Sequence, residues 1–164
     1  MRRTLGWIGT FKWIGTFSVG GAMAAAGGCA TSAVLQQELT KTNTQTVLAF
    51  EETVFNKHEV SEAFAHYVGP NFVEHDSHLR GAVEKSADPQ QPPAVPQAYA
   101  ALIVRLGRQS QRVFLRTIAQ GDLVATQSRW DTGQAPAINV VDIYRLHEGR
   151  IVEHWDVIQD RGGT

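Results

Sequence analysis

The fold is decided near the end of the chain, in residues 137–159, which read AINVVDIYRLHEGRIVEHWDVIQ. Two runs rich in β-branched and aromatic residues, Ala137–Leu146 and Arg150–Ile158, flank the short polar segment His147-Glu148-Gly149. Such runs around a turn that contains glycine are typical of an antiparallel β-hairpin. We therefore predict two paired strands here, and the rest of the chain is interpreted outward from them.

The register of this hairpin depends on the length of its turn. With a three-residue turn, residues 147–149, Asp142 lies directly opposite His154. Tyr144 and Asp156 then share the same face of the sheet. A two-residue turn would shift the register by one residue and separate Asp142 from His154. We expect the three-residue turn, and with it a polar group on one face.

The elements upstream of the hairpin follow from hydrophobic periodicity and from turn residues. Apolar residues recur at three- and four-residue intervals in the first expected helix. Residues 86–97 contain four prolines and are expected to form a loop or flap. The other expected elements are a helix around Val47–Phe55, a helix Val60–Tyr67, a strand Asn71–Asp76, a helix Ala98–Leu106, and strands Arg112–Ala119 and Leu123–Trp130. Helices followed by an antiparallel meander predict an α+β fold with helices on one face of the sheet.

Composition limits the class of protein. The chain has 164 residues, a formal net charge of −1 and a single cysteine. This length suits one domain, and one cysteine excludes an internal disulfide and a multi-thiolate metal site. The near-neutral charge argues against nucleic-acid binding. A basic stretch interspersed with apolar residues is expected to be a solvated face; it contains Arg105, Arg108, Arg112 and Arg116.

The first 28 residues differ from the rest of the chain. They contain three of the fifteen Lys and Arg residues and none of the sixteen acids, so residues 29–164 carry −4. Residues 13–26 are an uncharged run of 14, which suits the core of a signal peptide and is short for a membrane span. Cys29 follows small residues, as in a bacterial lipobox, and is the expected lipidation site. The alternative is ordinary cleavage near Ala24 or Ala33 and a free secreted protein.

These observations divide the chain into three parts. Residues 1–28 are expected to be a signal peptide, residues 29–40 a tether and residues 41–160 the domain. The protein is therefore expected to be exported to the cell envelope, either anchored to the membrane through an acylated Cys29 or periplasmic.

Asp142 is the most informative residue of the domain because it lies within an apolar, β-branched run. A buried carboxylate is costly unless it is paired, and desolvation raises its pKa toward that of a useful general base. The alternative is a structural aspartate, held by His154 or by an arginine. The residues alone leave both interpretations open.

A second polar cluster, Phe72–His78, contains two histidines that could face the same cavity. His75 and His78 could act as acid/base groups there. They could also join His154 and Asp156 as metal ligands, or cap backbone groups in a turn. We favour pocket lining over a metal site. Trp130 is expected in the core or at an interface more than in ligand stacking.

Three segments resemble a known family: Val141–Gln159, Phe72–His78 and Ile118–Ala125. They are similar to SnoaL-like proteins of the nuclear transport factor 2-like superfamily, and the likeness covers about residues 41–159. The terminal segment resembles the subfamily predicted to catalyse aldol-type condensations. This resemblance implies a cone-shaped α+β fold, with N-terminal helices packed on a curved antiparallel sheet around a pocket, and homodimers formed through the sheet.

The family's polyketide cyclases use an acid/base carboxylate and no metal or organic cofactor. The resemblance thus implies a cofactor-independent acid/base enzyme, an aldol-condensation cyclase or an isomerase, acting on a small carbonyl compound. Its site residues here would be Asp142, His75 and His154 as catalytic groups, and His78, Asp156, Tyr144 and Trp130 in ligand binding. The chain departs from the family in its proline-rich stretch Asp88–Pro96. The alternative function is an envelope lipoprotein that binds a small ligand or a partner without catalysis.

Overall fold

The protein is described by a computed structural model for residues 24–77, 79, 95–133 and 135–159, with side chains described from residue 31 onward. The described helices are α1 (Ala24–Glu51), the π-helical turn η1 (Glu52–Asn56), α2 (Val60–Tyr67) and α4 (Val95–Leu106). The described strands are β1 (Val68–Glu74), β2 (Gln111–Gln120), β3 (Leu123–Asp131), β4 (Ile138–His147) and β5 (Arg150–Gln159).

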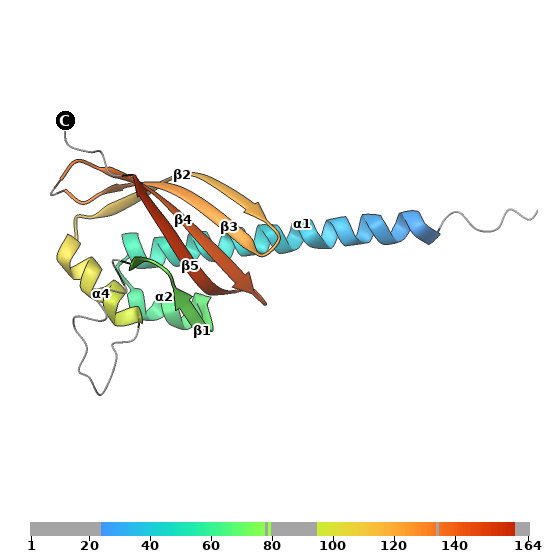
Figure 1. The fold of residues 1–164 in the computed structure, drawn as a ribbon, viewed down its shortest axis with the longest axis horizontal. Helices are drawn as coiled ribbons and strands as arrows, with labels where there is room; N and C mark the ends of the chain where they lie inside the picture. Colours follow the sequence, from blue (N-terminus) through green and yellow to red (C-terminus); the bar gives the residue numbers. More distant parts are fainter. Residues whose placement is uncertain (1–23, 78, 80–94, 134, 160–164) are drawn as a thin grey trace, which may run out of the picture.

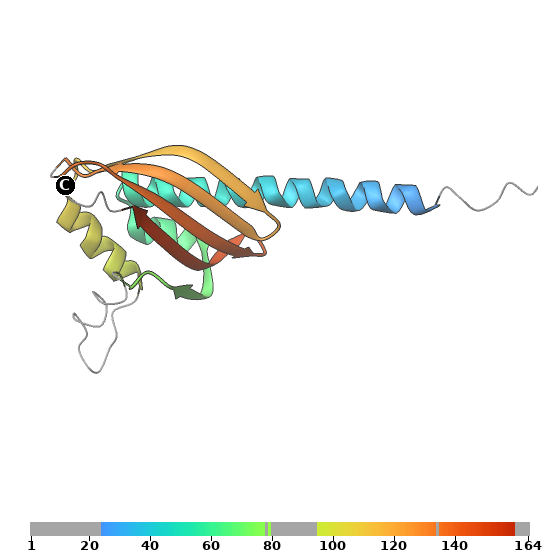
Figure 2. The ribbon, with the colours of Figure 1, turned by 45° about the horizontal axis from the view of Figure 1, so that its top comes forward.

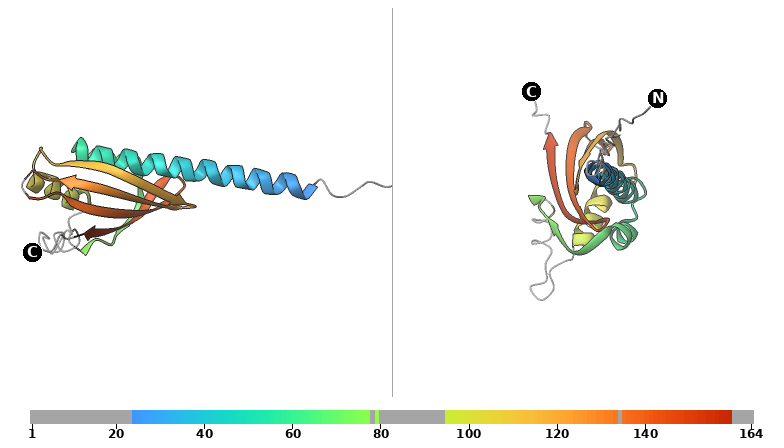
Figure 3. Two further views of the ribbon diagram at one scale, coloured as in Figure 1. Left: turned by 90° about the horizontal axis from the view of Figure 1, so that it is seen from above. Right: turned by 90° about the vertical axis from the view of Figure 1, so that its right-hand side faces the viewer.

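The five described strands form one sheet in the order β1-β5-β4-β3-β2. Strands β2 to β5 are successive antiparallel neighbours, which confirms the predicted meander. Strand β1 pairs in parallel with β5, so the sheet is mixed. The helices lie on one face of the curved sheet (Figures 1 and 3). The α+β class predicted from the sequence is confirmed.

Most element boundaries agree with the sequence pattern. Helix α2 has the predicted bounds, and the four strands of the meander differ from prediction by one residue at most at each end. Helix α4 begins at Val95, so residues 95–97 are helical rather than part of the predicted loop. Pro96 lies in the first turn of the helix, where its missing N–H costs no hydrogen bond. The rest of the predicted loop, up to residue 94, is outside the described residues.

Helix α1 is longer than the periodicity around Val47–Phe55 predicts. It begins at Ala24, and its first half projects beyond the sheet (Figure 2). The segment expected to be a tether, residues 29–40, is therefore helical, and its side chains from residue 31 to 39 are exposed. Its role as a tether stays a prediction. Among the helices described, none is both long and apolar enough to cross a bilayer.

The turn between β4 and β5 is shorter than predicted. His147 pairs with Arg150, which leaves the two-residue turn Glu148-Gly149. Both residues have positive φ values, 50° and 75°. Two consecutive residues with positive φ are required in a type I′ turn, which suits the twist of a hairpin. The predicted three-residue turn is wrong.

A β-bulge at Val152 nevertheless restores the predicted face. The two-residue turn and the bulge each shift the pairing by one residue. Asp142 therefore pairs with Asp156, and Tyr144 with His154, rather than Asp142 with His154. A shift of two residues keeps side chains on the same face of a strand. The predicted pairs are wrong, whereas the predicted grouping on one face is correct.

The core lies between this inner face of the sheet and the helices. Phe50 of α1 is fully buried, and its ring is 5.5 Å from that of Phe64, 6.4 Å from Tyr99 and 6.0 Å from Tyr144. These edge-to-face contacts join α1, α2, α4 and β4. Ile151, which the predicted register placed on the opposite face, is fully buried in this core because it precedes the bulge.

Candidate functional site

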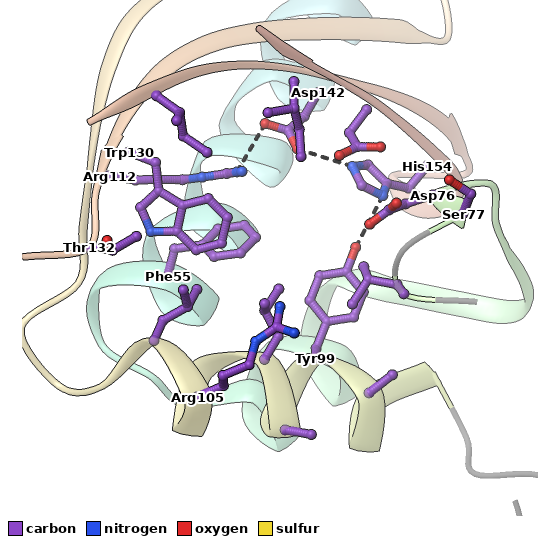
Figure 4. Close-up of a pocket in the computed structure, with 18 residues that line it drawn as sticks. Phe55, Asp76, Ser77, Tyr99, Arg105, Arg112, Trp130, Thr132, Asp142 and His154 are labelled. Carbon is purple, nitrogen blue, oxygen red and sulfur yellow. Dashed lines mark hydrogen bonds and ion pairs between the residues drawn. The ribbon is translucent and has the colours of Figure 1, made fainter. Parts of the chain in front are cut away.

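A cavity of about 620 Å³ lies between the inner face of the sheet and α4 (Figure 4). Its volume falls in the range of small-molecule sites. One part of the wall is apolar and includes Phe55, Leu102, Trp130 and Ile138. The charged side chains that line it are Asp76, Arg105, Arg112, Asp142, His154 and Asp156. An apolar cavity with a few convergent charges is suited to a ligand that carries a polar reacting group.

Arg112 forms one end of a buried ion pair. Its Nη1 donates to Asp142 Oδ2 at 2.9 Å, and both side chains are 2% exposed. The guanidinium lies between two aromatic rings, 3.8 Å from the centroid of Phe55 and 4.6 Å from that of Trp130. The pairing of β2 with β3 explains why Arg112 points into the cavity. Arg112, near the start of β2, lies opposite Trp130 of β3, and both side chains are on the inner face of the sheet. The expectation of a solvated Arg112 is wrong.

His154 connects this pair to the other side of the cavity. Its Nε2 is 3.2 Å from Asp142 Oδ1, and its Nδ1 is 2.8 Å from Glu74 Oε1. Tyr99 of α4 donates its hydroxyl proton to Glu74 Oε2 at 2.8 Å and lies 3.0 Å from His154 Nδ1. The parallel pairing of β1 with β5 brings Glu74 beside His154. Both ring nitrogens of His154 are thus engaged.

Hydrogen bonding decides the charge of both central groups. Burial opposes the charged form of His154, but its bonds to Asp142 and Glu74 outweigh burial and raise its pKa from 6.5 to about 10. Burial likewise opposes the charged form of Asp142, but Arg112 and His154 outweigh it and lower its pKa below 3.8. Asp142 is therefore a stabilised carboxylate held by Arg112 and His154, which is the structural one of the two interpretations that its sequence context left open.

Glu51 lies behind the ion pair and outside the cavity wall. Its Oε1 accepts hydrogen bonds from Thr126 at 2.8 Å and Tyr144 at 3.0 Å, and lies 3.7 Å from Arg112 Nη1. Burial, together with the charge of Asp142, raises the pKa of Glu51 from 4.5 to about 8. Glu51 is therefore mainly protonated at neutral pH.

This pKa predicts how stability depends on pH. The folded state holds the Glu51 proton up to about pH 8, whereas the unfolded chain releases it near 4.5. Stability therefore falls as pH rises through this window, because only the unfolded state has lost the proton. The Glu51→Gln variant lacks this contribution. Between pH 5 and pH 8 its free energy of unfolding is therefore expected to decrease by on the order of 2 kcal/mol less than that of the wild type.

Urea unfolding at pH 5 and pH 8 measures this difference, with the exposed Glu59→Gln as the matched control. Groups such as His154 titrate in both proteins, so the difference between them isolates Glu51. Equal pH dependence in wild type and Glu51→Gln would contradict a proton held in the folded state.

Asp156 stands apart from the network. It is half-buried on β5, lines the cavity, and forms no side-chain hydrogen bond or ion pair with any described residue. Burial and the nearby charge of Asp76 raise its pKa above 3.8. Asp156 is thus a carboxylate that is open to a ligand and has a raised affinity for a proton, as a general base requires.

The structure brings together some of the predicted site residues. Asp142, His154, Asp156 and Trp130 all line the cavity. Tyr144 lies behind it, with its ring stacked 4.7 Å from that of His154.

Of the two predicted histidines of the Phe72–His78 cluster, His75 lies away from this site. His75 is on the outer face, stacked on Trp155 at 4.6 Å and 3.4 Å from Glu153 Oε2, so its predicted catalytic position is wrong. His78 is outside the described residues, as is the side chain of Cys29. Within the described part of the chain, no three potential ligands gather in a way that could hold a metal ion.

Four residues of the network were missed by reasoning from the sequence: Glu51, Glu74, Tyr99 and Arg112. Glu51 did give a signal, because it interrupts the apolar stripe of α1 four residues after Val47 and next to Phe50. Tyr99 looked like an ordinary core aromatic. Glu74 lies in the polar cluster Phe72–His78 and Arg112 in the basic stretch, but no local pattern assigns them to this network, since their partners are distant in the sequence.

Comparison with known proteins identifies related sequences and folds. Residues 47–154 match the SnoaL-like domain. A candidate polyketide cyclase from Acidithiobacillus ferrooxidans has a similar structure, with 16% identity over 73% of this chain and 89% of that chain and a TM-score of 0.52. A candidate ketosteroid isomerase from Kribbella flavida has 14% identity over 76% and 83%, with a TM-score of 0.54.

The candidate hydroxylase AclR from Streptomyces galilaeus is also similar, with 17% identity over 74% of this chain and 81% of that chain and a TM-score of 0.53. At these identities the structural likeness establishes the fold. No curated protein sequence matches the chain significantly.

Proposed function

The chain belongs to the SnoaL-like domain family, and on this premise we propose that its cavity is a cofactor-independent acid/base site for a small carbonyl compound. The reaction is an aldol-type condensation, a cyclisation or an isomerisation. Solved structures described as a candidate polyketide cyclase and a candidate ketosteroid isomerase share the fold, which supports this range of reactions.

The unpaired Asp156 is the observation that carries the proposal. Asp142 has its carboxylate engaged by Arg112 and His154, and its lowered pKa makes it a poor proton acceptor. Asp156 lines the same cavity without a side-chain partner among the described residues. We therefore assign proton abstraction to Asp156, and to Asp142 the positioning of Arg112 and His154.

The proposed chemistry starts with proton transfer. Asp156 takes a proton from the carbon next to the substrate carbonyl, and the electron pair moves to the carbonyl oxygen to give an enolate. In an isomerisation, protonated Asp156 returns the proton at another carbon. In an aldol-type reaction, the enolate carbon attacks a second carbonyl, and the proton passes to the new alkoxide.

Two buried cations face this reaction. Arg112 and His154 line the cavity and are held in place by Asp142 and Glu74. Fixed charges in a largely apolar cavity stabilise a developing enolate more than they would in water. His154 contributes here as a fixed positive charge, since both of its nitrogens are already engaged.

A specific observation favours the second candidate, a non-catalytic binding protein. Glu74 and Asp142 engage both ring nitrogens of His154, and Asp142 also pairs with Arg112 Nη1, as in a structural core. If Asp156 does not exchange protons with a ligand, the same cavity selects small molecules without reaction.

Exchange of protons next to a carbonyl distinguishes the two candidates. The full-length protein is incubated in deuterium oxide with the aryl ketone β-benzoylpropionate or its methyl ester, and loss of the α-proton signal is followed by NMR. An acid/base site is expected to accelerate exchange of at least one compound by tenfold or more (roughly, given the usual contribution of a positioned base). No acceleration over heat-unfolded protein for either compound would contradict catalysis.

We further propose that a second copy of the chain covers the outer face of the sheet. Strand register aligns an apolar row across four strands, in which Trp155 pairs with Ile143, Ile143 with Ala125, and Ala125 with Ile118. Ile118 is 69% exposed, and Val157 on the same face is 62% exposed. Exposed apolar side chains in a continuous row are typical of a protein interface.

Light scattering after size-exclusion chromatography tests this dimer. Wild type is expected to have the mass of two chains, whereas Ile118→Lys raises the dissociation constant by about a hundredfold, because a charge is buried in the interface. Val104→Lys on α4 is the control, since Val104 is 81% exposed but lies away from the sheet. Monomeric wild type, or dissociation equally caused by Val104→Lys, would contradict an interface on the outer face.

Export remains a proposal that the N-terminal sequence supports. We propose cleavage of residues 1–28 and acylation of Cys29, which would hold the domain at the cell envelope. Mass spectrometry of the mature N-terminus tests it: an acylated Cys29 is expected, and a non-acylated start beyond Cys29 would refute the lipid anchor.

A further inference from the structure

Arg105 has an unusual place among the cavity charges. It projects from α4 into the cavity, toward the sheet (Figure 4). It is solvent-exposed and forms no hydrogen bond or ion pair with a described residue. The other two lining cations have carboxylate partners: Arg112 Nη1 pairs with Asp142, and His154 with Glu74 and Asp142. The Nε of Arg112 is buried and has no hydrogen-bond partner among the described residues. Within the described cavity wall, Arg105 is therefore the cation that has no carboxylate partner.

The other charges of the cavity wall show how Arg105 affects which ligand charge the cavity favours. Asp76, Asp142 and Asp156 line the wall together with the cations. Without Arg105, an anionic ligand would meet Asp156, which has no cation partner among the described residues, and two cations that already pair with Asp142 or Glu74. Like charges at short distance in an apolar cavity repel strongly. Arg105 thus favours a ligand with an anionic group.

Arg105 and Asp156 lie on opposite walls, one on α4 and one on β5. Apolar side chains such as Leu102, Trp130 and Ile138 line the same cavity. A ligand that satisfies both charges has an anionic group for Arg105, an apolar body, and an acidic C–H next to a carbonyl for Asp156.

Building on the proposed function, we propose that the substrate is a keto acid with an apolar body, and that Arg105 selects it by binding its carboxylate. A guanidinium is well matched to a carboxylate, because two parallel N–H donors meet its two oxygens. Arg105 is then the specificity-determining residue and Asp156 the base.

A matched pair of ligands isolates the carboxylate. β-Benzoylpropionate and its methyl ester share the aryl ketone, and only the first carries a charge. Their binding to the full-length protein is measured by calorimetry. Wild type is expected to bind the acid about tenfold more tightly than the ester, the strength of a charge-assisted hydrogen bond in a partly shielded site.

Three variants test the role of Arg105. Arg105→Gln is expected to lose the preference for the acid without changing ester binding, and Arg105→Lys to keep part of it. Arg108→Gln removes an exposed arginine outside the cavity wall and is expected to change neither affinity. Equal binding of acid and ester by wild type, an unchanged preference in Arg105→Gln, or no binding of either compound would overturn the proposal.

Proton exchange in the same two compounds separates this proposal from the proposed function. If the acid binds through Arg105 but its α protons do not exchange, the selection of a carboxylate by Arg105 is supported and the proposed catalysis is refuted. If the α protons of the ester exchange as fast as those of the acid, and Arg105→Gln changes neither rate, the proposed catalysis is supported and the selection of a keto acid by Arg105 is refuted.

Discussion

Replacing Arg112 by methionine is expected to destabilise the domain by about 3–5 kcal/mol, the usual cost of removing one partner of a buried ion pair. The change leaves Asp142 without the cation that is 2.9 Å away, at a site where both side chains are 2% exposed. Methionine fills much of the arginine volume between Phe55 and Trp130, so lost charge rather than lost packing dominates. Urea unfolding at pH 7 measures the loss.

Arg116→Met is the matched control, because Arg116 is exposed on the same strand. Its effect is expected to stay within about 0.5 kcal/mol, as for most surface changes. If Arg112→Met lowers the free energy of unfolding by less than about 1 kcal/mol, the effect is no larger than that of a surface ion pair. That result would contradict a buried ion pair between Arg112 and Asp142.

Replacing Asp156 by asparagine is expected to slow proton exchange in a bound ketone by a factor of about 10² to 10⁴, the usual contribution of a general base. The side chain keeps its size but can no longer accept the proton. Folding should persist, because Asp156 has no side-chain hydrogen bond or ion pair to lose among the described residues and its charge lies near that of Asp76. NMR exchange rates in deuterium oxide, with unfolding measured in parallel, test both expectations.

The control for this variant is Asp122→Asn, whose carboxylate is 60% exposed on the hairpin between β2 and β3. It should not change exchange, and its stability should change by less than about 1 kcal/mol, because the ion pair that it loses, 3.6 Å from Arg145 Nε, is exposed. Asp142→Asn provides the contrast, since it should lose stability together with activity by releasing Arg112 and His154. Full exchange activity in Asp156→Asn would refute its role as the base.

Local sequence pattern was enough to predict the meander and the face that carries the site. Alternation along β4 and β5 placed Asp142, His154 and Asp156 on one side. The turn was misjudged because residues 147–149 suit either a two- or a three-residue turn. The grouping was still correct because the bulge at Val152 shifts the register once more. Side-chain parity is therefore easier to predict than residue pairing.

The chemistry of the site could not be predicted in the same way. The sequence context of Asp142 indicated burial, which alone raises a carboxylate pKa. Arg112 and His154 reverse the direction of this shift and lower the pKa of Asp142, and Arg112 is 30 residues away in the chain. The contact between Glu74 and His154 spans 80 residues and depends on the parallel pairing of β1. Long-range partners decide these charges, and they leave no trace in local periodicity.

The central claim is that Asp156 accepts the proton while Asp142 stays ionised to hold the cations. Titration of the two side-chain carboxyl carbons by ¹³C NMR tests it most directly. We expect Asp156 to titrate above the ordinary value of 3.8 and Asp142 below it. Titration of Asp142 above Asp156 would contradict the claim and return the role of base to Asp142.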